Sequence, residues 1–80
     1  MKYYVYLIRC ADNSLYCGIA TNIQKRVEQH NTGKGSKYVR SRGPAVLVYS
    51  EEYGDISSAL KREADIKKWS KLKKEELVGV

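Results

Sequence analysis

"YVYLIRCADNSLYCG", residues 4–18, decides the fold because two β-rich segments flank a short polar turn. Tyr, Val, Leu and Ile fill most of residues 3–9, and "LYCGIA" at 15–20 resumes the same extended pattern. Between them, "CADNS" supplies the Asp, Asn and Ser side chains that favour tight turns. The stretch therefore predicts a β-hairpin. The chain has 7 tyrosines and no phenylalanine, so the hydroxyl groups of this hairpin call for an explanation.

The length of the loop fixes which side chains of the hairpin share a face. We expect a three-residue loop, 11–13, with Asn13 in the left-handed conformation that Asn tolerates. The strands then pair as Cys10 with Ser14, Ile8 with Tyr16 and Tyr6 with Gly18. One face carries Tyr4, Tyr6 and Tyr16, and the other carries the apolar Val5, Leu7, Leu15, Cys17 and Ile19. A two-residue loop would instead place Tyr6 and Tyr16 on opposite faces.

The rest of the chain predicts helices and one more strand. Thr21 with Gln24 three residues later is a capping-box pattern, which predicts a helix over about 22–31. "AVLVYSEEY" predicts a strand, and "DISSALKREADIKKWSKL" predicts a helix from near Asp55 to Trp69 or Ser70. A short lysine-rich helix follows at about 71–77.

These elements predict a single domain over residues 1–80, because 80 residues are about half of a typical domain length. The fold class is α/β of the α+β type: a small three-stranded antiparallel sheet flanked by helices, in the order ββαβα with a short C-terminal helix. Cys10 and Cys17 are too few and too isolated for a disulfide framework or a zinc site. We interpret both as small apolar strand residues.

The charge of the chain favours polyanionic partners. Lys and Arg number 15 against 9 Asp and Glu, which gives a net charge of +6 and a pI of about 9.4. Such a balance is typical of proteins that bind nucleic acid or an anionic membrane surface. No apolar run approaches the roughly 20 residues that span a bilayer, and the first ten residues do not form a signal peptide. We therefore expect a soluble, cytoplasmic protein.

The first predicted helix carries two polar residues on its core-facing side. Ile23 and Val27 mark that side, and Arg26 and His30 fall within about 60° of Ile23 at 100° per residue. In the structural interpretation, the Arg26 stem covers the core edge and His30 hydrogen-bonds a loop. In the functional interpretation, the guanidinium binds a phosphate, because its planar fork donates two parallel hydrogen bonds and stays charged.

The second long helix carries a carboxylate in the middle of its apolar arc. Glu63 falls between Ala59 and Leu60 on the helical wheel, and Ile56 extends the same arc. A carboxylate on a buried face must be paired, protonated or bound to a cation. An i,i+4 ion pair with Lys67 would satisfy it. A metal ion would do so equally well, since Mg²⁺ commonly takes one or two protein carboxylates, waters and phosphate oxygens.

A basic segment, "TGKGSKYVRSRGP", lies between the first helix and the third strand. Its cations and single aromatic residue suit a surface that tracks a nucleic-acid backbone, and they are Lys34, Lys37, Tyr38, Arg40 and Arg42. The alternative is an ordinary solvated loop. The later "KKWSKLKK" segment is less specific, and we expect Trp69 to belong to the core.

The order of these motifs resembles the GIY-YIG nuclease domain, and in particular its short stand-alone members. "YVY" at 4–6 stands in the place of the first family motif and "YCG" at 16–18 in the place of the second. A helix with Arg26 and His30, a third strand and a helix with Glu63 follow in the family's order. The resemblance covers essentially the whole chain. An asparagine that several members carry about three turns after the glutamate is missing here.

The resemblance implies a DNA endonuclease that uses one divalent ion, Mg²⁺ or Mn²⁺. Tyr6 would then activate the attacking water, Tyr16 would be the second active-site tyrosine, and Arg26 would bind the phosphate. His30 would assist, and Glu63 would be the metal ligand. Tyr6 opposite Gly18 would leave open space above the sheet for the phosphate. These side chains would have to meet around one pocket.

Three classes of function follow from these patterns. The leading hypothesis is a metal-dependent DNA endonuclease with structure-directed or weak sequence selectivity, for which a dimer or a protein partner would supply any strong specificity. The alternative is a nucleic-acid-binding module that keeps the nuclease scaffold but has little or no activity. In the third, a structural interaction domain, Glu63 simply pairs with Lys67.

Overall fold

Strand β1, Tyr3–Arg9, is the centre of the sheet in the computed structural model, which describes residues 1–32 and 44–79. β2, Leu15–Ala20, and β3, Val46–Tyr53, both pair with β1 in the antiparallel sense, so the strand order is β2-β1-β3. All four central residues of β1 are buried, because helices cover the sheet on both sides. The predicted three-stranded antiparallel sheet is confirmed.

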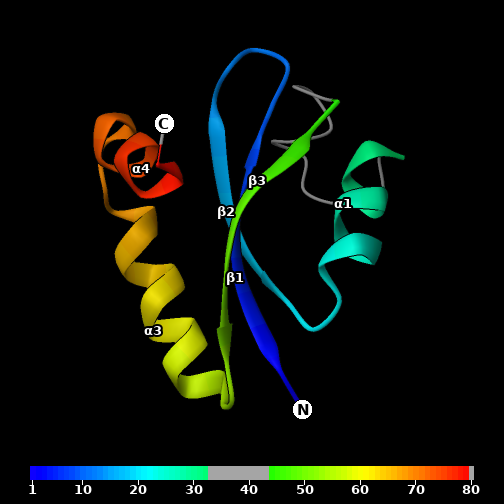
Figure 1. Cartoon of the computed structure of the whole chain (residues 1–80), viewed down its shortest axis with the longest axis vertical. Coiled ribbons are helices and arrows are strands. Elements are labelled where there is room, and N and C mark those ends of the chain that lie inside the picture. Colours follow the sequence, from blue (N-terminus) through cyan, green and yellow to red (C-terminus); the bar gives the residue numbers. More distant parts are fainter. Residues whose placement is uncertain (33–43, 80) are drawn as a thin grey trace.

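The helices lie on opposite faces of this sheet (Figure 1). α1, Ile23–Asn31, covers one face, whereas α3, Ile56–Lys67, and α4, Lys71–Val78, cover the other. Each begins after a side chain that accepts a hydrogen bond from a backbone N–H of its first turn, and these caps are Asn22, Asp55 and Ser70. Within residues 1–32 and 44–79, no helix has the length and apolar character to cross a membrane.

The hairpin has the predicted three-residue loop. Asn13 adopts a left-handed backbone with φ of 70°, and its N–H donates to the Cys10 carbonyl at 2.9 Å. The Cys10 N–H donates to the Ser14 carbonyl at 2.9 Å, which closes the hairpin. Tyr6 therefore pairs with Gly18, as expected from the sequence. This register gives each face of the sheet its own set of side chains.

Both faces are packed with apolar side chains. Under α1 the buried residues are Tyr6, Ile8, Cys10, Ala20 and Ala45, with Tyr16, Ile23 and Val27 packed against them. Under α3 and α4 they are Val5, Leu7, Cys17, Ala59 and Ile66, with Trp69, Leu77 and Val78 among their neighbours. The face with the tyrosines is thus a second half of the core, and Cys10 and Cys17 are buried free thiols.

The observed helix boundaries correct two local predictions. The cap of α1 is Asn22 and not Thr21, because the Asn22 side chain accepts from the Lys25 N–H at 3.1 Å. α3 ends at Lys67, before the predicted Trp69, and the Trp69 N–H already donates to the Ile66 carbonyl in the turn that follows.

The apolar arc of α3 is also narrower than predicted. Ile56 and Leu60 are 49% and 46% exposed, so they lie at the margin of the helix–sheet contact. Ala59 and Ile66 are completely buried and mark the side that meets the sheet. Because Glu63 lies one turn from each of them, it stands on the sheet-facing side of α3.

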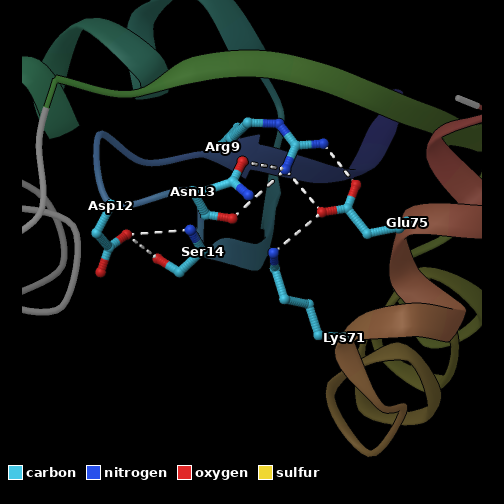
Figure 2. Close-up of polar contacts among 6 residues, drawn as sticks. All are labelled: Arg9, Asp12, Asn13, Ser14, Lys71 and Glu75. Atoms are coloured by element: carbon cyan, nitrogen blue, oxygen red, sulfur yellow. Dashed lines mark hydrogen bonds and ion pairs between the residues drawn. The ribbon is translucent and has the colours of Figure 1, made fainter.

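Arg9 ties α4 to the end of the hairpin (Figure 2). Its guanidinium donates to both carboxylate oxygens of Glu75, at 2.7 and 2.5 Å, and to the side-chain oxygen of Asn13 at 3.0 Å. Lys71 approaches the same carboxylate at 3.3 Å. The hydrogen bonds from Arg9 hold the pKa of Glu75 at about 2. This bidentate pair fixes α4 against the sheet.

Glu51 ties α3 to strand β3. Its carboxylate accepts hydrogen bonds from Arg62 at 2.9 Å, from the Tyr53 hydroxyl at 2.7 Å and from the Tyr49 hydroxyl at 2.5 Å. Burial alone would raise the pKa of Glu51, but these hydrogen bonds outweigh burial and hold the pKa at about 2. The Arg62 guanidinium also lies over the Trp69 ring, 5.1 Å from its centroid, which confirms that Trp69 belongs to the core.

We expect Glu51→Gln to destabilise the fold in a pH-dependent way. Because folding lowers the pKa of Glu51 from 4.5 to about 2, its ionised form adds stability above pH 4.5, and this is lost as the pH falls towards 2. The variant should lose about 2–3 kcal/mol at pH 7 and converge on the wild type in acid. Urea unfolding at several pH values measures the difference.

Glu52→Gln is the matched control for this experiment. Glu52 neighbours Glu51 on β3, and its pair with Lys2 at 3.5 Å is largely exposed, so its loss should change stability by well under 1 kcal/mol. Equal effects of the two variants at pH 7 would contradict the assignment.

Candidate active site

A tyrosine of the central strand and a histidine of α1 form the centre of the site. The Tyr6 hydroxyl lies 3.0 Å from Nε2 of His30, and the two side chains are only 1% and 3% exposed. The Tyr16 ring meets the His30 ring edge-on, with centroids 5.5 Å apart. The predicted tyrosine pair therefore converges on the predicted histidine.

Arg26 completes this group from the preceding turn of α1. Its guanidinium is close enough to Tyr6 and His30 for its charge to act on the pKa of both groups. Arg26 is exposed, and it lines a hollow of about 190 Å³ at the edge of the sheet. Residues of the sheet, of the turn after β2, of α1 and of α3 line this hollow. They are Tyr3, Ile19, Ala20, Thr21, Arg26 and Ile56. Arg26 thus joins the buried pair to an open surface.

Burial controls the protonation of the pair. Burial raises the pKa of Tyr6 to about 12, although the positive charge of Arg26 opposes the rise. Burial also lowers the pKa of His30, and the charge of Arg26 adds to that effect. Both groups are therefore neutral near pH 7. In the Nδ1–H tautomer of the imidazole, the Tyr6 hydroxyl donates its hydrogen bond to Nε2.

Gly18 is a steric requirement of this arrangement. A Cβ atom at Gly18 would lie 2.4 Å from the Tyr6 hydroxyl oxygen and 2.5 Å from the adjacent ring carbon. The prediction of open space above Gly18 was therefore wrong, because the phenol of Tyr6 itself fills that space. The open surface beside the buried pair is therefore on the side where Arg26 is exposed.

Glu63 approaches the sheet from the other layer. Its side chain is 16% exposed and pairs with the Lys67 ammonium at 3.4 Å. Its charge also acts on Cys17 of β2, whose pKa is raised to about 11, first by burial and then by Glu63. Since Cys17 belongs to the core under α3, whereas Tyr6 belongs to the core under α1, the sheet lies between Glu63 and Tyr6.

The structure therefore assembles Tyr6, Tyr16, Arg26 and His30 as one group and sets Glu63 apart. The ion pair with Lys67, which the sequence left as one of two alternatives, is present. Lys74 of α4 also acts on Cys17, and it was not among the predicted residues. Lys74 precedes Leu77 and Val78 by three and four residues, and both of these pack against the core. Residues at this spacing share a helix face, so the sequence could have indicated that Lys74 faces inward.

The donor chemistry of Glu63 fits a hydrated divalent ion. No cluster of three or more His, Cys, Asp or Glu side chains occurs in the part of the chain that the structure describes. A site closed by protein ligands is therefore not formed there. A single, mostly buried carboxylate is nevertheless what Mg²⁺ uses when waters and substrate oxygens complete its coordination.

The predicted backbone-tracking residues Lys34, Lys37, Tyr38, Arg40 and Arg42 lie outside the described residues. Their role in binding nucleic acid stays a prediction.

Comparison with known proteins identifies the class to which this site belongs. The family model of the GIY-YIG catalytic domain matches residues 2–76. The chain belongs to the GIY-YIG family, a superfamily of nuclease domains.

Individual relatives are UPF0213 proteins. One from Staphylococcus haemolyticus is 47% identical over 77 residues, which covers 96% of this chain and 94% of the relative. One from Natronomonas pharaonis is also 47% identical over 77 residues, covering 96% and 91%. The solution NMR structure of a UPF0213 protein from Bacillus halodurans matches with a TM-score of 0.64 at 40% identity, covering 99% of this chain and 84% of that one. The likeness thus extends over nearly the whole chain.

We expect Gly18→Ala to displace the Tyr6 ring from its position. Because the new methyl group would overlap the phenol, the variant should lose about 1–3 kcal/mol, which corresponds to a fall in Tm of about 4 °C or more per kcal/mol. Thermal unfolding by circular dichroism measures this. Gly54→Ala is the control, since nothing lies within 4 Å of a Cβ at that position. Equal Tm values for the two variants would refute the contact.

Proposed function

We propose that this chain is a divalent-metal-dependent endonuclease that hydrolyses phosphodiester bonds of DNA, with structure-directed or weak sequence selectivity. The family supports the class of nuclease. The observation that carries the proposal is the 3.0 Å contact between the Tyr6 hydroxyl and His30 Nε2 beside the guanidinium of Arg26. These three side chains would supply a proton acceptor, a relay and a phosphate ligand in one place.

In this proposal, Tyr6 and His30 act as a relay. A phenol whose pKa is about 12 is a poor base by itself near neutrality. Neutral His30 removes this difficulty, because its Nε2 can accept the Tyr6 proton while the Tyr6 oxygen accepts a proton from the attacking water. Tyr16, whose ring meets that of His30 edge-on, holds the imidazole in position.

Arg26 would bind the phosphate and stabilise the charge that develops on its oxygens during attack. Its exposure and its place in the hollow at the sheet edge suit this role. Glu63 would hold the metal from the other face of the sheet, so the scissile phosphate would lie at the outer edge of β2. When bound, Mg²⁺ or Mn²⁺ would neutralise charge on the phosphate and on the leaving oxygen.

A second candidate is a DNA-binding module with little or no cleavage. The Glu63–Lys67 ion pair favours it, because this carboxylate already has a cation within the protein. The net charge of +6 supports binding under either proposal. Any strong selectivity would come from a dimer or a protein partner.

We expect Mg²⁺- or Mn²⁺-dependent nicking that depends on two residues. Flaps, forks, nicked duplexes and single strands are incubated with each metal, and the products are resolved on denaturing gels. Tyr6→Phe keeps the ring but removes the hydroxyl, so it should slow cleavage by about 10²–10⁴-fold. Glu63→Gln should abolish cleavage and leave salt-sensitive DNA binding intact. Tyr4→Phe is the control for loss of a hydroxyl from the same strand.

The outcome of the cleavage assay distinguishes the endonuclease from the DNA-binding module. Binding without nicking by the wild type would support the binding module. Cleavage by Glu63→Gln at the wild-type rate would point to a contaminating nuclease.

We expect the pH dependence of cleavage to follow His30. The relay needs neutral His30, and burial together with Arg26 lowers its pKa from 6.5. Single-turnover rates should therefore decline in acid with a midpoint below pH 6.5. His30→Gln should lose this acid limb along with most of the rate. A wild-type midpoint above 6.5, with DNA binding constant over the range, would contradict the relay.

A further inference from the structure

The carboxylate of Glu63 lies close to a cation that belongs to the protein. Lys67 lies one helical turn further along α3, and its Nζ is 3.4 Å from Oε2 of Glu63. The two side chains differ in exposure, because Glu63 is 16% exposed and Lys67 is 51% exposed. A largely buried carboxylate needs a counter-ion, and a largely exposed lysine can supply it and also leave.

The surroundings of Glu63 explain why a counter-ion is kept there. The Glu63 carboxylate lies close enough to the buried thiol of Cys17 for its charge to act on it, and a thiol cannot serve as a counter-ion. Glu51 is already saturated by Arg62 and two tyrosines, so that arginine is committed elsewhere. Lys74 from α4 also acts on the Cys17 thiol, yet the cation in ion-pair contact with Glu63 is Lys67.

We propose that Lys67 is an exchangeable internal counter-ion of Glu63: its ammonium occupies the carboxylate in the free protein, and a divalent cation must displace it to bind. This inference rests on the metal-binding role of Glu63 in the proposed function. It adds that binding of the metal is an exchange of one cation for another. The affinity for metal is therefore set partly by a residue that never touches the metal.

The kind of ion pair makes such an exchange feasible. Two ion pairs that join a helix to the sheet, Arg9–Glu75 and Arg62–Glu51, use guanidinium forks with at least two hydrogen bonds each. Lys67 offers a single ammonium on a flexible stem, and a half-exposed pair of this kind contributes little stability. A divalent ion brings twice the charge to the same oxygen. The lysine can thus be displaced without unfolding α3.

The experiment is a titration of the full chain with Mn²⁺, in which electron paramagnetic resonance measures free metal. Lys67→Gln removes the competing ammonium, so its Kd for Mn²⁺ should fall by about two- to fivefold, which is the range expected for losing an exposed pair. Lys67→Arg keeps a cation at this position, and its Kd should equal or exceed that of the wild type. Glu63→Gln should lose the site.

Lys71→Gln is a closely matched control. Lys71 forms an i,i+4 pair with Glu75 at 3.3 Å and is 50% exposed, so the substitution removes the same charge and a similar pair. Because Glu75 also binds Arg9, we expect no change in the Kd for Mn²⁺. Thermal unfolding without metal checks that all variants fold. The Tm of Lys67→Gln and that of Lys71→Gln should fall by similar, small amounts.

A second measurement uses the wild type alone. In a titration with diamagnetic Mg²⁺, the side-chain NMR resonances of Lys67 should shift with the same midpoint as those of Glu63, whereas those of Lys71 should not. Equal Kd values for Lys67→Gln and Lys71→Gln, with a wild type that binds Mn²⁺ through Glu63, would overturn the exchange but leave the metal role of Glu63. If neither the wild type nor Lys67→Gln binds Mn²⁺, both the exchange and the metal-binding role of Glu63 are overturned.

Discussion

The packing of the Tyr6 ring over Gly18 is the constraint on which the rest of the site depends. The two residues are paired across β1 and β2, and the phenol occupies the volume that any side chain at position 18 would need. Only in that position does the hydroxyl reach His30, which α1 brings from 24 residues further along the chain. Gly18 therefore links the pairing register of the hairpin to the position of α1.

The same packing explains the division of the site. β1 is covered on both faces, so the phenol that points toward α1 is separated by the sheet from the carboxylate that α3 supplies. Arg26, at the margin of the α1 layer, shares a hollow with Ile56 of α3 and so reaches the boundary between the layers. In the proposed function, the groups from both faces of the sheet would therefore meet at the edge of β2, away from the middle of the sheet.

The carboxylates of Glu51, Glu75 and Glu63 take part in two kinds of ion pair. Glu51 with Arg62, and Glu75 with Arg9, are multidentate and hold the second layer in place. Glu63 with Lys67 is a single contact to a half-exposed lysine. The proposed nuclease function would use both kinds, because the scaffold must keep its shape while one carboxylate stays available to a cation. The tyrosine hydroxyls also fall into two groups. Those of Tyr49 and Tyr53 donate to Glu51 and stabilise the fold, whereas that of Tyr6 contacts His30 in the candidate site.

The sequence by itself determined the order of the elements, the hairpin register and the residues that meet on its tyrosine face. Alternation along two strands and the conformational tolerance of Asn13 are local properties, so short-range rules were sufficient. The i,i+4 spacing of Arg26 and His30 was likewise enough to place them together. Only the tertiary structure decided that Tyr6 fills the space above Gly18, that α3 buries Ala59 and Ile66 more than Ile56, and that Glu63 comes from the opposite layer. Helical spacing gives the direction of a side chain relative to its own axis, whereas the face of the sheet that a helix covers depends on packing between distant segments.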